Sequence, residues 1–242
     1  MAAEIGAWPA LLAAASLACL MGHPVLGLVG YAVLLVLALH EGAASDARRR
    51  LRGHAVALIS LGCITAVSLP QFLSPALDRV VVLAFTAVPL CWLCGMVPTV
   101  WQGLRVRRSA WSDGAWVIGG MAVALPLGLA MNSRPLPQER ADLIAMTVLV
   151  GFVPIVDEAL YRGVLMEAVG DSTSSVLVVA VVQGLAVGAA FGPSALAATT
   201  ALGAVFGFIR QSSGRWQSAL SAHWGVALGI AAPLLMAPGG IS

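Results

Sequence analysis

The sequence contains no lysine, so all 13 of its basic residues are arginines. Because alanine, glycine and valine are also heavily used, we attribute the missing lysine to a GC-rich genome, and not to function. The formal net charge is only +2, which is too small to indicate a nucleic-acid partner.

Charged side chains of both signs are scarce as well. They make up 10% of the 242 residues, while 60% of the residues are hydrophobic. A soluble globular protein carries about 25% charged residues. A chain with so little polar side chain cannot cover a water-facing surface. The composition therefore predicts an integral membrane protein with an all-α fold, a bundle of transmembrane helices.

The four cysteines do not form the framework of a disulfide-rich protein. Cys19 and Cys63 lie within apolar runs, and Cys91 and Cys94 share a helix face in "CWLC". We interpret these cysteines as small residues packed in a membrane helix. A metal-binding or redox pair at Cys91 and Cys94 is the alternative. The segment after Met1 contains Glu4 and no basic residue, so it lacks the positive start of a cleavable signal peptide.

Apolar runs between polar breaks predict eight or nine transmembrane helices, because about 20 apolar residues cross a bilayer. Eight spans are the alternative because the seventh and eighth runs are short and are divided only by "FGPS". We find no internal repeat and no long linker, so residues 1–242 are expected to form a single membrane domain. The runs are 7–22, 24–40, 54–73, 79–100, 114–131, 143–167, 174–190, 193–209 and 216–236.

Arginines predict the orientation, because cytoplasmic loops are enriched in them. The segments "DARRRLRGH", "RVRR" and "RQSSGR" follow the second, fourth and eighth runs. Nine spans with the N-terminus inside place all three segments in the cytoplasm. We expect the membrane to be the bacterial inner membrane.

One apolar helix carries three charges, Asp157, Glu158 and Arg162, in "VDEALYRG". A charge at bilayer depth costs about 2.5–3.5 kcal/mol, so such residues face the bundle interior or a hydrated cavity. Glu158 and Arg162 have the i, i+4 spacing of a helical ion pair. Asp157 lies about 100° round the helix and is freer to face a cavity. Pro154, one turn earlier, is expected to kink the helix; a purely structural Glu–Arg clamp is the alternative.

Two more polar residues are expected at the same depth. His223 lies about 10 Å into its span, Asp157 about 8–12 Å and Gln183 about 13 Å, all from the cytoplasmic side. Small residues surround these positions and allow helices to approach closely. They are Gly163, Gly184, Gly188, Gly203, Gly207 and Gly225.

"DEALYRGVL" followed by "AHWGVA" resembles the CPBP (Abi) family of CAAX prenyl proteases and bacteriocin-processing membrane proteins. The family pattern is E-E-x-x-x-R, then F-x-x-x-H, then H-x-x-x-N, on successive helices. The resemblance covers about residues 143–236. It implies that the first acid and the second-motif His activate a water, while the third-motif His and Asn stabilise the oxyanion.

Carried over, the resemblance predicts Asp157, Glu158, Arg162 and His223 as catalytic residues. Gln183, Tyr161 and Trp224 are predicted to contact the substrate. Two positions depart from the family pattern. Val187 stands where the second-motif His is needed, and Ala227 where the Asn is needed. Losing one oxyanion donor typically lowers the rate by about 10²–10³.

Three hypotheses follow, beside a fourth, a transporter with a proton relay, against which nine spans without an evident repeat argue. The chain is an intramembrane hydrolase acting on a prenylated or membrane-embedded peptide, with Asp157 as general base and His223 as electrophilic donor. Alternatively, it is a repurposed enzyme that cyclises or isomerises a lipophilic small molecule, since a buried acid can exchange protons near neutral pH. The third hypothesis is an inactive pseudoprotease that binds a membrane peptide, as in immunity. No cofactor is predicted, and His223 with two acids makes a poor zinc site.

Overall fold

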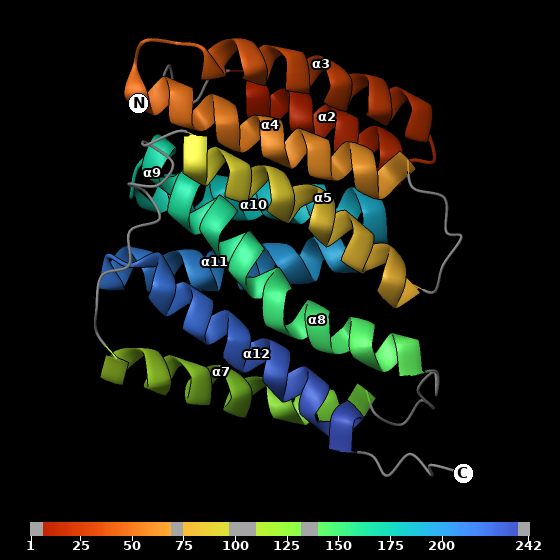
Figure 1. Ribbon diagram of the computed structural model, residues 1–242, viewed down its shortest axis with the longest axis vertical. Helices are drawn as coiled ribbons and strands as arrows, with labels where there is room; N and C mark the ends of the chain where they lie inside the picture. Colours follow the sequence, from red (N-terminus) through yellow and green to blue (C-terminus); the bar gives the residue numbers. More distant parts are fainter. Residues whose placement is uncertain (1–6, 69–74, 97–109, 132–139, 237–242) are drawn as a thin grey trace.

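The computed structural model describes residues 7–68, 75–96, 110–131 and 140–236. Every regular element within these ranges is a helix (Figure 1), which confirms the all-α prediction. The elements are α2 Trp8–Leu20, α3 Pro24–Gly42, α4 Ala47–Ser68, α5 Pro75–Met96, α7 Ala110–Met131, α8 Arg140–Asp157, the π-helix η1 Glu158–Leu165, α9 Met166–Val169, α10 Thr173–Phe191, α11 Pro193–Ser213 and α12 Trp216–Met236.

As far as the described residues extend, each predicted apolar run corresponds to one helix, with α8, η1 and α9 forming the sixth. Five helices in the described part of the chain are long and apolar enough to cross a membrane. They are Pro24–Gly42, Ala47–Ser68, Ile144–Val169, Thr173–Phe191 and Pro193–Ser213. Three shorter apolar stretches are Trp8–Leu20, Val80–Cys91 and Asp113–Pro126. The protein is thus an integral membrane protein with five candidate spans in the described residues, and the count of eight or nine spans stays a prediction.

The break between α10 and α11 is a glycine–proline junction. Gly192 has φ +92°, a conformation that favours glycine, and its N–H donates to the carbonyl of Gly188. Pro193 then opens α11, where its missing N–H costs no helical hydrogen bond. The "FGPS" sequence therefore separates two helices, as predicted. Their close packing agrees with the expected role of the small residues, because a Cβ on Gly188 would lie 2.5 Å from the Cβ of Leu196.

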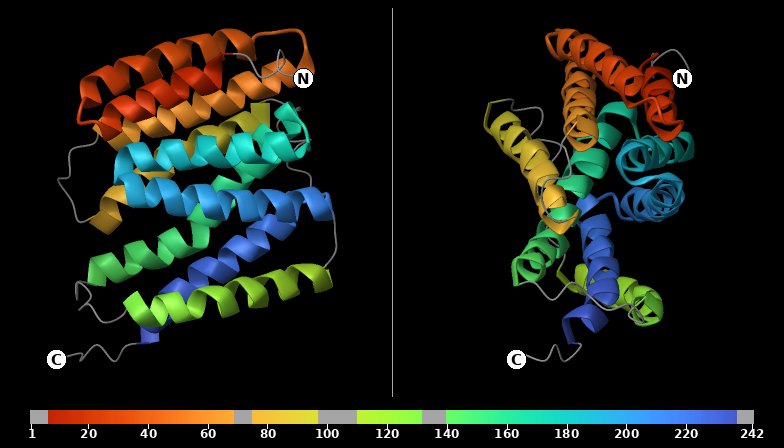
Figure 2. Two further views of the ribbon diagram at one scale, coloured as in Figure 1. Left: turned by 180° about the vertical axis from the view of Figure 1, so that it is seen from behind. Right: turned by 90° about the vertical axis from the view of Figure 1, so that its right-hand side faces the viewer.

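The helices run side by side, with α2, α3 and α4 at one edge of the bundle and α7 at the other (Figure 1). Viewed along the helices, η1 lies near the middle, between α4 and α12 (Figure 2, right). Helices α10 and α11 pack together on one side of it, and α5 packs against α8 on the other. The charged segment is therefore enclosed by protein, and not by lipid.

Helix α7 packs mainly against α12, at very short backbone distances. A Cβ on Gly120 would lie 2.4 Å from the carbonyl oxygen of Ala222, and one on Gly225 would lie 2.1 Å from that of Val117. Because real Cβ atoms do not approach carbonyls so closely, glycine is required at both positions. This contact fixes α12, which carries His223.

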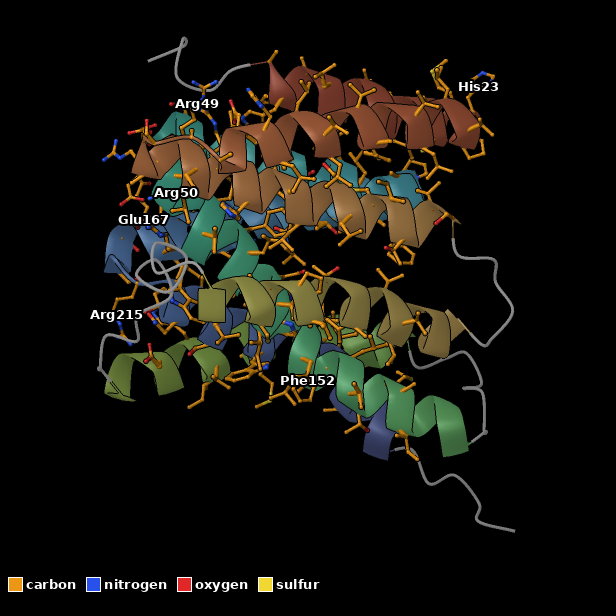
Figure 3. The ribbon with its side chains drawn as sticks, turned by 45° about the horizontal axis from the view of Figure 1, so that its top comes forward. His23, Arg49, Arg50, Phe152, Glu167 and Arg215 are labelled. Atoms are coloured by element: carbon orange, nitrogen blue, oxygen red, sulfur yellow. The ribbon has the colours of Figure 1, made fainter. Side chains whose placement is uncertain are left out.

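The basic segments gather at one end of the bundle. Arg49, Arg50, Glu167 and Arg215 lie at this end, while His23 lies at the opposite one (Figure 3). The arginines predicted to occupy loops partly belong to helices, since α4 begins at Ala47 and α11 continues to Ser213. "RVRR" lies outside the described residues. The C-terminal end of α5 and the N-terminal end of α7 lie at the same end of the bundle as the start of α4 (Figure 1).

Candidate active site

The charged segment is a π-helix, in which backbone bonds join residues five apart. It begins at Glu158, four residues after Pro154, and continues to Leu165. Pro154 has no N–H to donate, so the α-helical ladder is already interrupted one turn before the acids. The kink expected at Pro154 stays a prediction, and the helix type changes four residues after Pro154. π-helical segments are frequently found at functional sites.

Glu158 and Arg162 form the predicted i, i+4 ion pair. The Arg162 Nε lies 3.4 Å from the Glu158 Oε2, and both side chains are completely buried. A buried pair is stable only when further hydrogen bonds satisfy its remaining polar atoms. Arg162 has two such bonds, from Nη1 to the Oε1 of Gln183 at 2.6 Å and from Nη2 to the carbonyl of Gly203 at 2.6 Å.

Gln183 links Arg162 to Asp157. Because a guanidinium can only donate, the Gln183 oxygen must face Arg162. The Gln183 Nε2 then faces Asp157 and donates to its Oδ2 at 3.3 Å. The Asp157 carboxylate thus accepts a hydrogen bond from Gln183 through Oδ2. The Asp157 side chain is only partly buried.

His223 contacts the second acid of the pair. Its Nδ1 lies 2.9 Å from the Glu158 Oε1, and its ring stacks on Phe206 with centroids 4.7 Å apart and planes at 21°. The His223 side chain keeps 16% of its surface exposed. A carboxylate that accepts from Nδ1 orients the imidazole and directs Nε2 away from the buried pair.

These five side chains form one continuous polar chain, in the order Asp157, Gln183, Arg162, Glu158 and His223. The three inner members are fully or almost fully buried, while the two terminal members are partly exposed. The structure therefore brings Asp157, Gln183 and His223 into one connected set, while their common depth in the membrane stays a prediction. We call this arrangement the polar chain.

The amino-acid sequence of this region matches one protein family. Residues 139–229 match the family model described as type II CAAX prenyl endopeptidase Rce1-like. The chain therefore carries an Rce1-like domain. This confirms the resemblance stated from the motifs. No curated protein and no solved structure matches the chain.

The Rce1-like domain contains the whole polar chain, and the helices before it contribute none of its members. The two positions at which this domain departs from the family pattern lie on α10 and α12, which also carry members of the polar chain. Val187 is one turn beyond Gln183 on α10, and Ala227 is one turn beyond His223 on α12. Both side chains are partly buried and neither can donate a proton.

Two residues predicted to contact the substrate already have protein partners. Tyr161 is 5% exposed within the apolar core, and its ring centroid lies 6.0 Å from the Arg162 guanidinium carbon. The Trp224 Nε1 donates to the carbonyl of Gly151 at 2.9 Å, which ties α12 to α8. Both contacts are structural, so a substrate role for these residues remains a prediction.

Sequence reasoning missed two residues of the Rce1-like domain, Phe206 and Arg210 on α11. Phe206 stacks on His223, and its ring centroid lies 5.9 Å from the Arg162 guanidinium carbon. Arg210 was predicted as part of a cytoplasmic loop, yet its side chain is only 7% exposed and contacts η1. The one sequence feature that could have indicated their role is their i, i+4 spacing near the end of an apolar helix, which places both side chains on the same helix face.

None of the three cysteines whose side chains are described is a member of the polar chain. Cys19, Cys63 and Cys91 are free thiols, and Cys91 is exposed on α5. The side chain of Cys94 lies outside the described residues. In the described part of the chain, no three His, Cys, Asp or Glu side chains are grouped as metal ligands.

Proposed function

We propose that the protein is an intramembrane hydrolase that cleaves a prenylated or membrane-inserted peptide by acid–base chemistry. The observation that carries this proposal is the polar chain, with partly exposed ends and a buried middle. Groups that act on a substrate must be reachable, while groups that position them are best buried and fully bonded. Asp157 and His223 are the reachable groups.

In this mechanism Asp157 is the general base. It takes a proton from water, and the water oxygen attacks the carbonyl carbon of the scissile amide. His223 donates from Nε2 to the developing oxyanion, and Glu158 stabilises the imidazolium from the Nδ1 side. The C–N bond then breaks, and the proton on Asp157 passes to the leaving nitrogen. Gln183 and Arg162 position the two acids.

The mechanism requires two carboxylates, Asp157 and Glu158, and two cations, Arg162 and the imidazolium of His223, so the charges it uses sum to zero. A neutral set is the least costly way to keep ionised groups inside a bilayer. The substrate class comes from the family, whose name specifies prenylated CAAX peptides.

We place the arginine-rich end of the bundle in the cytoplasm, following the positive-inside rule. With nine membrane-crossing helices, the N-terminus is also cytoplasmic, and the membrane is the bacterial inner membrane. The site is then entered from the cytoplasmic half of the bilayer, where a lipid anchor on a peptide would hold the substrate.

The test uses purified protein in lipid vesicles and a panel of farnesylated, geranylgeranylated and unmodified membrane-inserted peptides, followed by mass spectrometry. Wild type is expected to cleave at least one peptide, and Asp157→Asn to cleave none. A matched control is Glu167→Gln, which removes an exposed carboxylate at the cytoplasmic end. Cleavage that survives Asp157→Asn would falsify the assignment, and no cleavage by wild type would contradict hydrolysis.

A second candidate is a non-hydrolytic acid–base enzyme that cyclises or isomerises a lipophilic small molecule. The apolar side chains of Val187 and Ala227 favour it, because they remove two groups that would hold water and an oxyanion. Isomerisation needs neither. The distinguishing measurement compares lipid extracts of membranes containing wild type or Asp157→Asn. A mass-neutral or water-loss product that depends on Asp157 identifies this activity. Val187→His with Ala227→Asn should then create no peptidase.

A further inference from the structure

Arg210 lies outside the polar chain but contacts the backbone that carries it. Its Nε donates to the carbonyl oxygen of Arg162 at 3.1 Å. Its Nη2 donates to Glu167 at 3.1 Å, and its Nη1 pairs with Asp171. The two carboxylate side chains are more than half exposed, while Arg210 is almost completely buried. A buried arginine thus connects the π-helix to the water-facing end of the bundle.

The carbonyl that Arg210 contacts lies where the π-helix becomes an α-helix. The N–H of Met166 donates to the carbonyl of Tyr161, five residues earlier. The N–H of Gly170 donates to the carbonyl of Met166, four residues earlier. Between these two bonds lie four backbone carbonyls, those of residues 162–165, and only three backbone N–H groups, those of residues 167–169. One of the four carbonyls therefore has no backbone N–H to accept from.

We propose that Arg210 is a positioning residue that supplies this missing donor and so stabilises the π-helical form of the site. In an ordinary α-helix the carbonyl of Arg162 would bond to the amide of Met166, and Arg210 would be redundant. An unsatisfied buried carbonyl is unfavourable. Removing Arg210 therefore shifts the segment toward the α-helical form.

The helical form determines whether the polar chain can exist. A change between π-helical and α-helical bonding shifts the helix by one residue. This shift rotates the part of the helix before the change by about 100° relative to the part after it. Asp157 lies before the π-helix and Arg162 within it, and both bond to the same Gln183. A change of register would separate these contacts. Helices η1 and α11 are linked in both directions, since Arg210 on α11 donates to the carbonyl of Arg162 and Arg162 donates to the carbonyl of Gly203 on α11.

Three variants separate this role from that of an ordinary ion pair. Arg210→Lys keeps the charge but cannot reach both the carbonyl and the carboxylates. Arg210→Met removes every donor. Glu167→Gln with Asp171→Asn removes the carboxylates and keeps the Nε donor. If Arg210 acts through the carbonyl, the two Arg210 variants have large effects and the double carboxamide variant has a small one.

The first readout is hydrogen exchange of the peptide covering residues 158–169 in lipid nanodiscs. It needs no substrate, so it is independent of the proposed hydrolysis. Both Arg210 variants are expected to exchange at least about tenfold faster there. Peptides of α3 and α4 should be unchanged in the same experiment, which also controls for global unfolding. Equal exchange in Arg210→Lys and in the double carboxamide variant would overturn the proposal.

The second readout rests on the proposed function and separates positioning from stability. With a cleaved peptide in hand, Arg210→Lys is expected to lower kcat by about 10- to 100-fold with little change in KM, because misplacing the acids affects the chemical step. The double carboxamide variant should retain most of kcat. Faster exchange together with an unchanged kcat would refute the positioning role, whichever reaction the enzyme catalyses.

Discussion

The Nδ1 of His223 lies 2.9 Å from the Oε1 of Glu158, although 65 positions separate the two residues in the sequence. The carboxylate therefore has two cationic or polar neighbours, His223 on one oxygen and Arg162 on the other. Asp157, next to Glu158 in the sequence, has a different partner, Gln183. The neighbouring acids Asp157 and Glu158 thus have different environments. Substitutions at the two positions are therefore expected to differ in their effects on stability and activity.

Glu158→Gln is expected to destabilise the protein far more than Asp157→Asn. The first change leaves the buried Arg162 charge without its carboxylate, and breaking a buried pair typically costs about 3–5 kcal/mol. Asp157→Asn keeps an oxygen that can accept from Gln183, at a partly exposed position. Unfolding in mixed micelles measures the difference. Similar midpoints for the two variants would contradict the division into a buried frame and reachable ends.

His223→Asn is expected to fold and to lose activity. The Asn amide can replace Nδ1 as donor to Glu158, but it places nothing where Nε2 acts on the substrate. Removing one oxyanion donor lowers the rate by about 10²–10³. His223→Ala should lose both the activity and some stability, because Glu158 then loses a partner. Cleavage rates and unfolding midpoints of the two variants are the measurement; activity retained in His223→Asn would exclude Nε2 chemistry.

Gln183→Met is expected to break two links of the polar chain, those to Asp157 and to Arg162, while preserving side-chain volume. It removes the acceptor for the Arg162 Nη1 and the donor to Asp157. A buried unpaired donor costs about 1–3 kcal/mol, and more for a charged group. The matched control is Val181→Met, two residues away on the exposed face of α10. If both variants unfold alike and remain equally active, Gln183 does not connect Arg162 to Asp157.

Gly120→Ala is expected to destabilise the contact between α7 and α12 by about 1–3 kcal/mol, because its Cβ would lie 2.4 Å from the Ala222 carbonyl oxygen. Gly119→Ala is the control, since a Cβ there meets nothing within 4 Å. The control should be neutral or slightly stabilising, as alanine is the better helix former. Thermal unfolding of the pair distinguishes the two positions, and equal stability would argue against direct backbone contact.

The helices themselves could be predicted because lipid requires long apolar runs, and breaks such as Gly192–Pro193 end them in a recognisable way. The Glu158–Arg162 pair could also be predicted, because i, i+4 spacing is a property of one helix. The partner of His223 could not, since sequence places Asp157 and Glu158 at nearly the same depth. Only the rotation of α12 relative to η1 decides which acid the imidazole meets.

The role of Arg210 was missed for a different reason. Its position near the end of an apolar helix is also that of an arginine facing the cytoplasm, and composition cannot distinguish the two. The π-helix was equally hidden, because no short sequence pattern specifies a change from i, i+4 to i, i+5 bonding. The mismatch between carbonyls and amides near Arg162 becomes visible only when individual backbone bonds are followed.

The order of the polar chain along the sequence has a consequence for the synthesis of the protein. Glu158 and Arg162 are made before every partner that neutralises or bonds them from another helix. Gln183 follows Arg162 by 21 residues, Gly203 follows it by 41, and His223 follows Glu158 by 65. A growing chain therefore contains a charged helix that lacks part of its inter-helix hydrogen bonds until α12 has been translated. The insertion machinery must shelter this helix from lipid for that interval, and a chain truncated before Trp216 should be rapidly degraded in the membrane.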